Sequence, residues 1–201
     1  MQMSEGIELD ENAEAWIVRF CRPEIRNPLS MDVLDGIDII LGRFAGVAAT
    51  AALIFTGTGD VFASGADLRE IAGVAPAKAA EFARRGQTLM ERVAALPCTI
   101  AAINGYCFGG GLDLALACKR RIASPAAKFA HPGAGLGIIT GWGGTQRLPR
   151  LVGQPNALEM FFTASPIDTE RALAIGLVDE LSDDPLAAAV GYARWMKEWS
   201  R

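Results

Sequence analysis

Three consecutive glycines at positions 109 to 111 stand between a predicted apolar strand and a predicted helix. The strand covers residues 99–103, and the helix is expected to begin at Leu112. Glycine weakens helices and strands, so three in a row suit a place where another group approaches the main chain closely. Amides in the first turn of a helix have no intrahelical acceptor and lie at the positive end of the helix dipole. The stretch therefore predicts a site where an anion binds or where negative charge develops.

A carboxylate accompanies these amides, because Asp113 falls in the first turn of the same helix. Hydrogen-bond donors beside a base suggest acyl chemistry. The alternative is that the glycines only allow tight packing of strand and helix, with Asp113 as a first-turn charge that the dipole favours. On this stretch alone the two interpretations are evenly matched.

A second stretch, residues 53–68, repeats the pattern of apolar strand, glycine-bearing loop and helix start. Gly57 and Gly59 follow the strand, and Asp67 is placed to cap the helix. The spacing GxGxxF is wrong for a dinucleotide site, and no long crossover helix follows it directly. The repetition favours a shared chemical purpose for the two glycine loops.

Together the two stretches resemble signatures of the crotonase family, also called the enoyl-CoA hydratase/isomerase superfamily. GxGxxFxxGADL is matched at 57–68, and NGxxxGGGxxLxLxCD at 104–119, where Lys119 stands in the last position. A third signature, GxxPGxGGTQRLPRLVG, is matched at 137–153 with Thr140 in the usual position of the proline. The resemblance runs from about Ile17 to Leu181, and it is specific because three separated motifs agree in order and spacing.

Strands that alternate with helices independently predict an α/β domain with right-handed crossovers. The resemblance implies a more specific shape, a crotonase-like spiral of ββα units. We expect one domain over 1–201, with a core at about 6–181 and a last helix at about 185–199. Strands are predicted at 6–9, 15–20, 49–55, 99–103, 121–123, 128–132 and 177–180, and further helices at 31–44, 77–96, 144–151, 155–164 and 169–174.

Family members continue with further helices beyond the position of Ser200, whereas this sequence stops at Arg201. The C-terminal helical region is therefore expected to be short. Either the acyl pocket is more open, or a neighbouring subunit closes it, or the sequence is cut short. The resemblance implies a homotrimer or a dimer of trimers.

Composition excludes several classes of function. The 201 residues are 51% hydrophobic, which supplies an ample core. A net charge of -4 argues against a nucleic-acid partner, and no basic run or long apolar stretch points to a membrane. The four cysteines show no CxxC spacing, and the acidic N-terminus does not look like a signal peptide, so we expect reduced thiols and a cytoplasmic protein.

The resemblance implies that the backbone amides of Ala66 and Gly110 form an oxyanion hole for a thioester carbonyl. Each such donor is typically worth about 10²- to 10³-fold in rate. The substrate is then an acyl-CoA, with coenzyme A present only as part of that substrate and with no separate cofactor or metal. Residues implied in substrate binding are Glu24, Arg26, Ser64, Ala66, Asp67, Leu68, Arg69, Tyr106, Gly110, Pro132, Gly133 and Leu136.

Within this set, the residues near Glu24 and Ser64 are implied to receive the adenine and pantetheine, while Tyr106 and residues 132–136 line the acyl pocket. Arg26 and Arg69 are candidates for phosphate contacts. The alternative for both arginines is a solvated surface charge.

The sequence departs from the hydratases of the family at their two glutamates. Asp113 occupies the first position, and Gly133, which has no side chain, occupies the second. Asp113 as a single base would suit isomerisation or assist a decarboxylation, whereas hydration loses one acid/base group worth about 10²- to 10⁴-fold. His131, the only histidine, could substitute as acid or base, although a lone histidine beside a proline is more often structural.

Two hypotheses follow. The leading one is an acyl-CoA enzyme of the enoyl-CoA hydratase/isomerase type, with catalytic groups at Ala66, Gly110, Asp113 and, as an alternative base, His131. The rival is a protein of the same shape that binds acyl-CoA or other subunits without catalysis, as the glycine at position 133 would permit.

Overall fold

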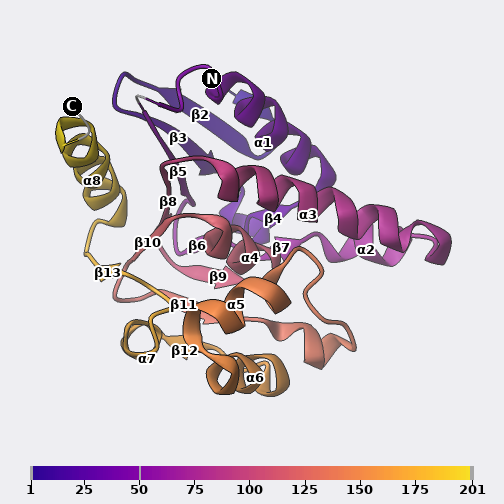
Figure 1. Cartoon of the computed structure of the whole chain (residues 1–201). Coiled ribbons are helices and arrows are strands. Elements are labelled where there is room, and N and C mark those ends of the chain that lie inside the picture. The colour runs from indigo at the N-terminus through magenta and orange to yellow at the C-terminus, as the bar shows by residue number, and fades with distance from the viewer. Residues whose placement is uncertain (1, 50, 200–201) are drawn as a thin grey trace.

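The computed structural model describes residues 2–49 and 51–199 as two sheets with helices packed around them (Figure 1). The larger sheet has the order β1-β2-β3-β5-β8-β10-β13. Its first three strands pair antiparallel, and the strands from β3 to β13 pair parallel. The strands are β1 (Gln2–Ser4), β2 (Ile7–Glu11), β3 (Ala15–Phe20), β5 (Ala52–Thr56), β8 (Thr99–Ile103), β10 (Arg120–Ala123) and β13 (Glu180–Leu181).

A second sheet has the order β12-β11-β9-β6, and β4 pairs with β7 separately. Strands β5, β8 and β10 of the larger sheet are each followed along the chain by one strand of the second sheet, β6, β9 or β11. This repeat is the spiral of ββα units that the resemblance implied. The strands are β4 (Pro28–Leu29), β6 (Val61–Ala63), β7 (Gly65–Ala66), β9 (Tyr106–Phe108), β11 (Lys128–Ala130) and β12 (Ile167–Asp168).

Helices cover both faces of the larger sheet, and α8 lies on the opposite side from α1 and α3 (Figure 1). The helices are α1 (Met31–Phe44), α2 (Leu68–Gly73), α3 (Ala79–Ala95), α4 (Gly110–Ala117), α5 (Gly144–Val152), α6 (Gln154–Thr163), α7 (Thr169–Ala174) and α8 (Pro185–Trp199). Short 3-10 turns are η1 (Pro23–Ile25), η2 (Pro76–Lys78) and η3 (Pro132–Leu136).

The two faces of the larger sheet build two apolar cores. Val18 and Phe55 point toward α1, α3 and α4, whereas Ile17 and Ile54 point toward α8. Because side chains alternate along a strand, a parallel sheet buried on both faces needs continuous apolar runs. Residues 52–56 and 99–103 are buried throughout and meet that requirement.

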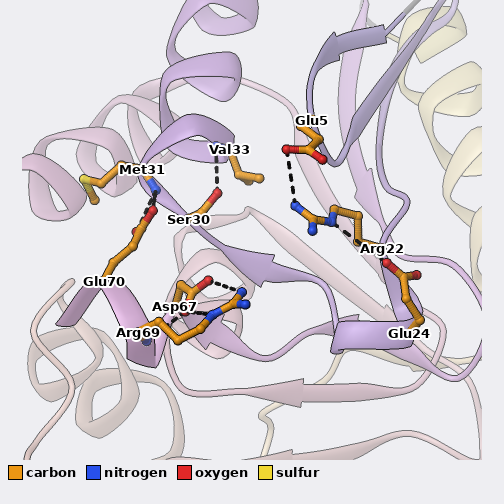
Figure 2. Close-up of polar contacts among 9 residues, drawn as sticks. All are labelled: Glu5, Arg22, Glu24, Ser30, Met31, Val33, Asp67, Arg69 and Glu70. Carbon is orange, nitrogen blue, oxygen red and sulfur yellow. Dashed lines mark hydrogen bonds and ion pairs between the residues drawn. The ribbon is translucent and has the colours of Figure 1, made fainter. Parts of the chain in front are cut away.

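The predicted Asp67 cap is confirmed, because Asp67 accepts a hydrogen bond from the Arg69 amide at 2.8 Å. Helix α1 is capped in a similar way by Ser30, which accepts one from the Val33 amide at 3.3 Å. Figure 2 shows both caps, together with the Met31 amide that donates to Glu70 of α2. The Met31 contact ties the start of α1 to α2, which lies beside the second glycine loop.

Several predicted boundaries are wrong. Helix α4, which follows the three glycines, begins at Gly110 rather than at the predicted Leu112. Its N-cap is Gly109, which takes a positive φ of 53°. The strand expected at 177–180 is reduced to Glu180–Leu181, since the Leu177 amide still bonds to the end of α7. The extended piece expected at 128–132 ends at Ala130, and a 3-10 turn begins at Pro132.

Asn104 ties the loop at 57–61 to the turn that follows β8. Its side-chain oxygen accepts from the Gly57 amide at 2.9 Å, and its nitrogen donates to the carbonyls of Gly59 at 3.0 Å and Val61 at 3.2 Å. A Cβ atom on the next residue, Gly105, would overlap the backbone of Asp60 in the same loop. This loop and turn are thus held at contact distance by one side chain and one glycine.

Replacing Asn104 by alanine is expected to lower the free energy of unfolding by about 2 kcal/mol, because backbone groups of Gly57, Gly59 and Val61 lose their partner. Urea unfolding at neutral pH measures the loss. Gln154→Ala, which removes an exposed amide at the start of α6, is the matched control and should change little. Equal effects of the two substitutions would show that Asn104 does not hold the loop and the turn together.

Candidate active site

A cavity of about 750 Å³ opens beside the N-termini of α2 and α4. Its lining is mostly apolar and includes η3, the segment before α5, and side chains of α6. Polar and charged residues are few among the lining residues, namely Arg26, Ser64, Asp67, Arg69, Asp113, His131 and Thr140. An apolar cavity with a few polar groups is the usual form of a small-molecule site.

The two glycine loops meet at this cavity. Ala66 of β7 and Gly110, the first residue of α4, both line it. A Cβ atom on Gly110 would stand 3.3 Å from the Ala66 nitrogen, and it would also overlap the ring of Trp142. Gly65 has a positive φ of 96°, and a Cβ atom there would lie only 2.5 Å from the Gly110 nitrogen. Only glycine at positions 65 and 110 allows this approach of two backbones.

Asp113 lies on α4, one turn into the helix, and is fully buried. Its Oδ2 accepts a hydrogen bond from the hydroxyl of Thr140, while its Oδ1 has no hydrogen-bond partner among the described residues. Burial raises the pKa of Asp113 to about 6, against the opposing influence of Thr140, the amides of Trp142 and Gly144, and the Arg147 charge. The carboxylate is therefore ionised at neutral pH but remains a usable base.

His131 stands directly before η3 and is 2% exposed. Its Nε2 lies 3.7 Å from Oδ1 of Asp113, and within the described part of the chain neither ring nitrogen has a hydrogen-bond partner. Burial lowers the pKa of His131 to about 4, and the ring packs on Phe161 with centroids 5.2 Å apart. The histidine is thus neutral at pH 7, next to an ionised carboxylate.

The two opposite pKa shifts predict compensating effects of pH on stability. The folded protein binds the Asp113 proton more tightly than the unfolded chain, so this group lowers stability by about 3 kcal/mol as pH rises from about 4 to 6. The unfolded chain binds the His131 proton more tightly, so this group raises stability by about 3 kcal/mol between pH 4 and 6.5. In the wild type the two contributions cancel.

Single substitutions should uncover each contribution. Relative to wild type, His131→Gln is expected to lose stability as pH rises from about 4 to 6.5, and Asp113→Asn is expected to gain stability over the same range. Urea unfolding at half-unit steps from pH 4 to 7 measures both slopes. Parallel curves for all three proteins would contradict the two pKa shifts.

Gly133 sits in a tight turn and has no space for a side chain. A Cβ atom there would lie 2.6 Å from the Ile138 carbonyl oxygen, and the Ile138 amide donates to the Gly133 carbonyl at 3.0 Å. Pro132, Gly133 and Leu136 line the cavity, as the sequence predicts. Position 133 contributes backbone alone to the cavity wall.

The residues implied in binding the CoA moiety fall into two groups. Arg26, Ser64, Asp67, Leu68 and Arg69 line the cavity. The Arg69 guanidinium is 2.7 Å from the Asp67 carboxylate, lowers its pKa, and is itself largely exposed (Figure 2). Arg26 and Arg69 are both exposed at the cavity, and the Arg69 guanidinium is held there by two hydrogen bonds to Asp67.

Glu24 and Tyr106 do not line the cavity. Glu24 is exposed, with its carboxylate 3.9 Å from Arg22 (Figure 2). Tyr106, expected in the acyl pocket, lies at the amino end of β9, whereas the cavity begins beyond the carboxyl end of that strand. Its ring instead lies beneath the Arg26 guanidinium, 5.6 Å from it. Tyr106 is close to the glycines of the site in sequence, but its position at the start of β9 leaves it outside the cavity lining.

Other lining residues were not predicted from the sequence. Phe161 and Phe162 on α6 both line the cavity, and Phe162 is 77% exposed. Two adjacent aromatic residues on a short helix cannot both face the core, which could have signalled a ligand surface. Trp142, expected as core or pocket wall, is buried and lines the cavity between Gly86 and Gly110.

No cluster of three or more His, Cys, Asp or Glu residues suited to a metal ion occurs within 2–49 and 51–199. Over the same residues, every helix is too short or too polar to cross a membrane.

The sequence and fold match known proteins. The family model described as enoyl-CoA hydratase/isomerase matches residues 10–200. The chain is 38% identical over 178 residues to the short-chain-enoyl-CoA hydratase of Clostridium acetobutylicum, a match that covers 88% of this chain and 68% of that protein. It is 39% identical over 179 residues to the crotonyl-CoA hydratase of Syntrophomonas wolfei, covering 88% and 69%.

Solved structures agree with these relatives. DspI of Pseudomonas aeruginosa superposes with a TM-score of 0.91 at 34% identity, covering 98% of this chain and 82% of that chain. An enoyl-CoA hydratase of Bacillus anthracis superposes with a TM-score of 0.85 at 36% identity, covering 96% and 76%.

Proposed function

The chain belongs to the enoyl-CoA hydratase/isomerase family and has the crotonase fold, and from this premise we propose that it moves a proton within an enoyl-CoA thioester. The amides of Ala66 and Gly110 hold the thioester oxygen, and Asp113 is the single acid/base. The observation that carries the proposal is one buried carboxylate beside two glycine-dependent backbone segments on a common cavity.

Thioester chemistry explains why two amides suffice for activation. Electron withdrawal by the carbonyl makes the α-carbon acidic, and donors aimed at the oxygen stabilise the enolate that forms when the α-proton leaves. The approach of Gly110 to the Ala66 nitrogen supports a shared role for the two amides. Helix α4 adds the positive end of its dipole at the same point.

Asp113 is suited to carry the proton. Its free Oδ1 takes the α-proton of a β,γ-enoyl thioester, which leaves a dienolate, and returns that proton to the γ-carbon to give the α,β-enoyl isomer. A pKa near 6 supports both steps, because the group is ionised before the first and acidic enough for the second. Gly133 offers no second carboxylate, which favours isomerisation over hydration.

Hydration is the second candidate. The relatives at 38% and 39% identity are named hydratases, and the unpartnered nitrogens of His131 near Oδ1 of Asp113 supply polar groups that a water molecule needs. Neutral His131 would then replace the missing second carboxylate.

Isotope labelling separates the candidates. The protein is incubated in deuterated water with crotonyl-CoA, a 3-enoyl-CoA and a malonyl-type CoA thioester, and the products are analysed by mass spectrometry and NMR. Isomerisation converts the 3-enoyl-CoA to the 2-enoyl-CoA, with label on the γ-carbon only to the extent that the proton on Asp113 exchanges with solvent. Hydration yields a labelled 3-hydroxyacyl-CoA, and decarboxylation yields a labelled acyl-CoA one carbon shorter. Binding without turnover of any thioester would overturn the enzymatic proposal in favour of an acyl-CoA-binding protein.

We also propose a homotrimer or a dimer of trimers, built from one domain per chain and located in the cytoplasm. The exposed apolar side chains of Leu158, Phe162 and Leu173 support assembly, since such groups are usually covered in oligomers. Light scattering coupled to size-exclusion chromatography measures the mass, and a monomer at micromolar concentration would contradict this assembly.

A further inference from the structure

We propose that Thr140 is a positioning residue for Asp113: its hydroxyl holds Oδ2 of the carboxylate and so keeps Oδ1 unbonded beside His131, in the ionised form. The inference rests on the proposed function of Asp113 as acid/base. Thr140 stands where the family signature has a proline, so the hydroxyl is a property of this chain.

The two oxygens of Asp113 lie in different environments. Oδ2 accepts the Thr140 hydroxyl, whereas Oδ1 is buried, lacks a hydrogen-bond partner in the described structure, and lies 3.7 Å from Nε2 of His131. A carboxylate fixed at one oxygen cannot rotate freely about its last bond. The Thr140 contact therefore selects which oxygen is available to a substrate.

The surrounding backbone is built to permit this contact. Thr140 lies on the irregular segment between η3 and α5 and lines the cavity itself. A Cβ atom on Gly144 would overlap Oδ1 of Asp113 and approach the Thr140 methyl group closely. Glycine at 144 thus leaves the space in which the hydroxyl and the carboxylate meet.

Besides Thr140, the backbone amides of Trp142 and Gly144 lower the pKa of Asp113, and both amides remain when the Thr140 hydroxyl is removed. The ionisable groups that face Asp113 are His131, kept neutral by burial, Arg147 of α5, and Cys107 of β9, whose pKa is raised well above its usual value. Arg147 is engaged with the Trp142 carbonyl at 3.1 Å. A hydroxyl that donates to a carboxylate stabilises the ionised form, so its loss raises the carboxyl pKa.

The test compares Thr140→Val, Thr140→Ser and the control Thr145→Val, which removes a nearby hydroxyl outside the cavity lining. Carbon-13 NMR of aspartate-labelled protein follows the Asp113 carboxyl, assigned by its absence in Asp113→Asn. We expect Thr140→Val to raise the Asp113 midpoint by about one pH unit. Thr140→Ser and Thr145→Val should keep the wild-type midpoint.

Kinetics supply a second readout. In Thr140→Val the acid limb of kcat against pH should move up with the NMR midpoint, which lowers kcat at pH 6 by about fivefold through ionisation alone. Loss of orientation adds a decrease that persists at pH 9, while KM stays near the wild-type value. Thr140→Ser should restore the wild-type position of the acid limb and the wild-type kcat at pH 9.

The outcomes are distinguishable. An unchanged Asp113 midpoint in folded Thr140→Val overturns the inference, even if activity falls. A raised midpoint in a protein that turns over no thioester supports the contact between Thr140 and Asp113 and overturns the proposed function. A raised Asp113 midpoint and a shifted acid limb of kcat in Thr140→Val, with wild-type values of both in Thr140→Ser, support the inference and the proposed function together.

Discussion

Asp113→Asn is expected to lower kcat by about 10²- to 10⁴-fold on whichever thioester the wild type turns over. Asparagine has the same shape and can still accept the Thr140 hydroxyl through its side-chain oxygen, but it cannot take a proton from carbon. Steady-state kinetics at pH 8, where the wild-type carboxylate is fully ionised, measure the effect. Asp10→Asn on β2 removes an exposed carboxylate far from the cavity and should leave kcat unchanged.

The fold should survive this substitution, because a buried charge is replaced by a neutral group. Thermal unfolding at pH 7 is expected to give a midpoint at or above that of the wild type. A well-folded Asp113→Asn variant with wild-type kcat would rule out Asp113 as the base, and the neighbouring His131 would then be tested in the same way. If the wild type turns over no thioester and Asp113→Asn only loses stability, the result would favour the non-catalytic alternative.

Gly110→Ala is expected to lower kcat by about 10²- to 10³-fold, the typical effect of removing one oxyanion donor. The added methyl group would stand 3.3 Å from the Ala66 nitrogen, in the space where a thioester oxygen would lie. A second readout is the near-ultraviolet absorbance of bound acetoacetyl-CoA, whose enolate the wild type should stabilise. The variant should lose that enolate signal together with its activity.

Overlap with Trp142 could destabilise Gly110→Ala as well, so the double variant Gly110→Ala/Trp142→Leu provides room for the methyl group. Gly42→Ala on α1 is the matched control, since its Cβ would meet nothing within 4 Å. That control should keep full activity and gain about 1 kcal/mol of stability from helix propensity. Retention of the enolate signal in the folded double variant would exclude Gly110 from the oxyanion hole.

The sequence predicts the parts of the site that depend on backbone approach. The glycines at 65 and 110 and the Asp67 cap are local features, and each appears where the motifs place it. Of the second sheet, the residue pattern predicted only β11, as the extended piece at 128–132, because strands of this sheet have only two or three residues. The alternation of apolar and polar residues that marks a strand cannot be recognised over so short a stretch. The short strands are nevertheless what brings the two glycine loops together.

Contacts between distant segments set the charge states in the cavity, and these do not follow from spacing. Thr140 and Asp113 are 27 positions apart, and His131 meets Asp113 because β11, which precedes it, pairs with β9, the strand that leads into α4. Burial, rather than residue type, raises the pKa of the Asp113 carboxyl to about 6 and keeps the His131 imidazole neutral at pH 7. Sequence reasoning kept both groups as candidates, since it had no measure of burial.

The turn at Gly133 has a consequence for how this chain could acquire or lose activities. Any side chain at that position collides with the Ile138 carbonyl, so a glutamate cannot be installed there by one codon change while the loop keeps its path. Conversion to a two-glutamate enzyme would first require a rebuilt loop between η3 and α5. Main-chain geometry therefore limits which side chains position 133 can carry, and a change of residue type there would not by itself supply a second carboxylate.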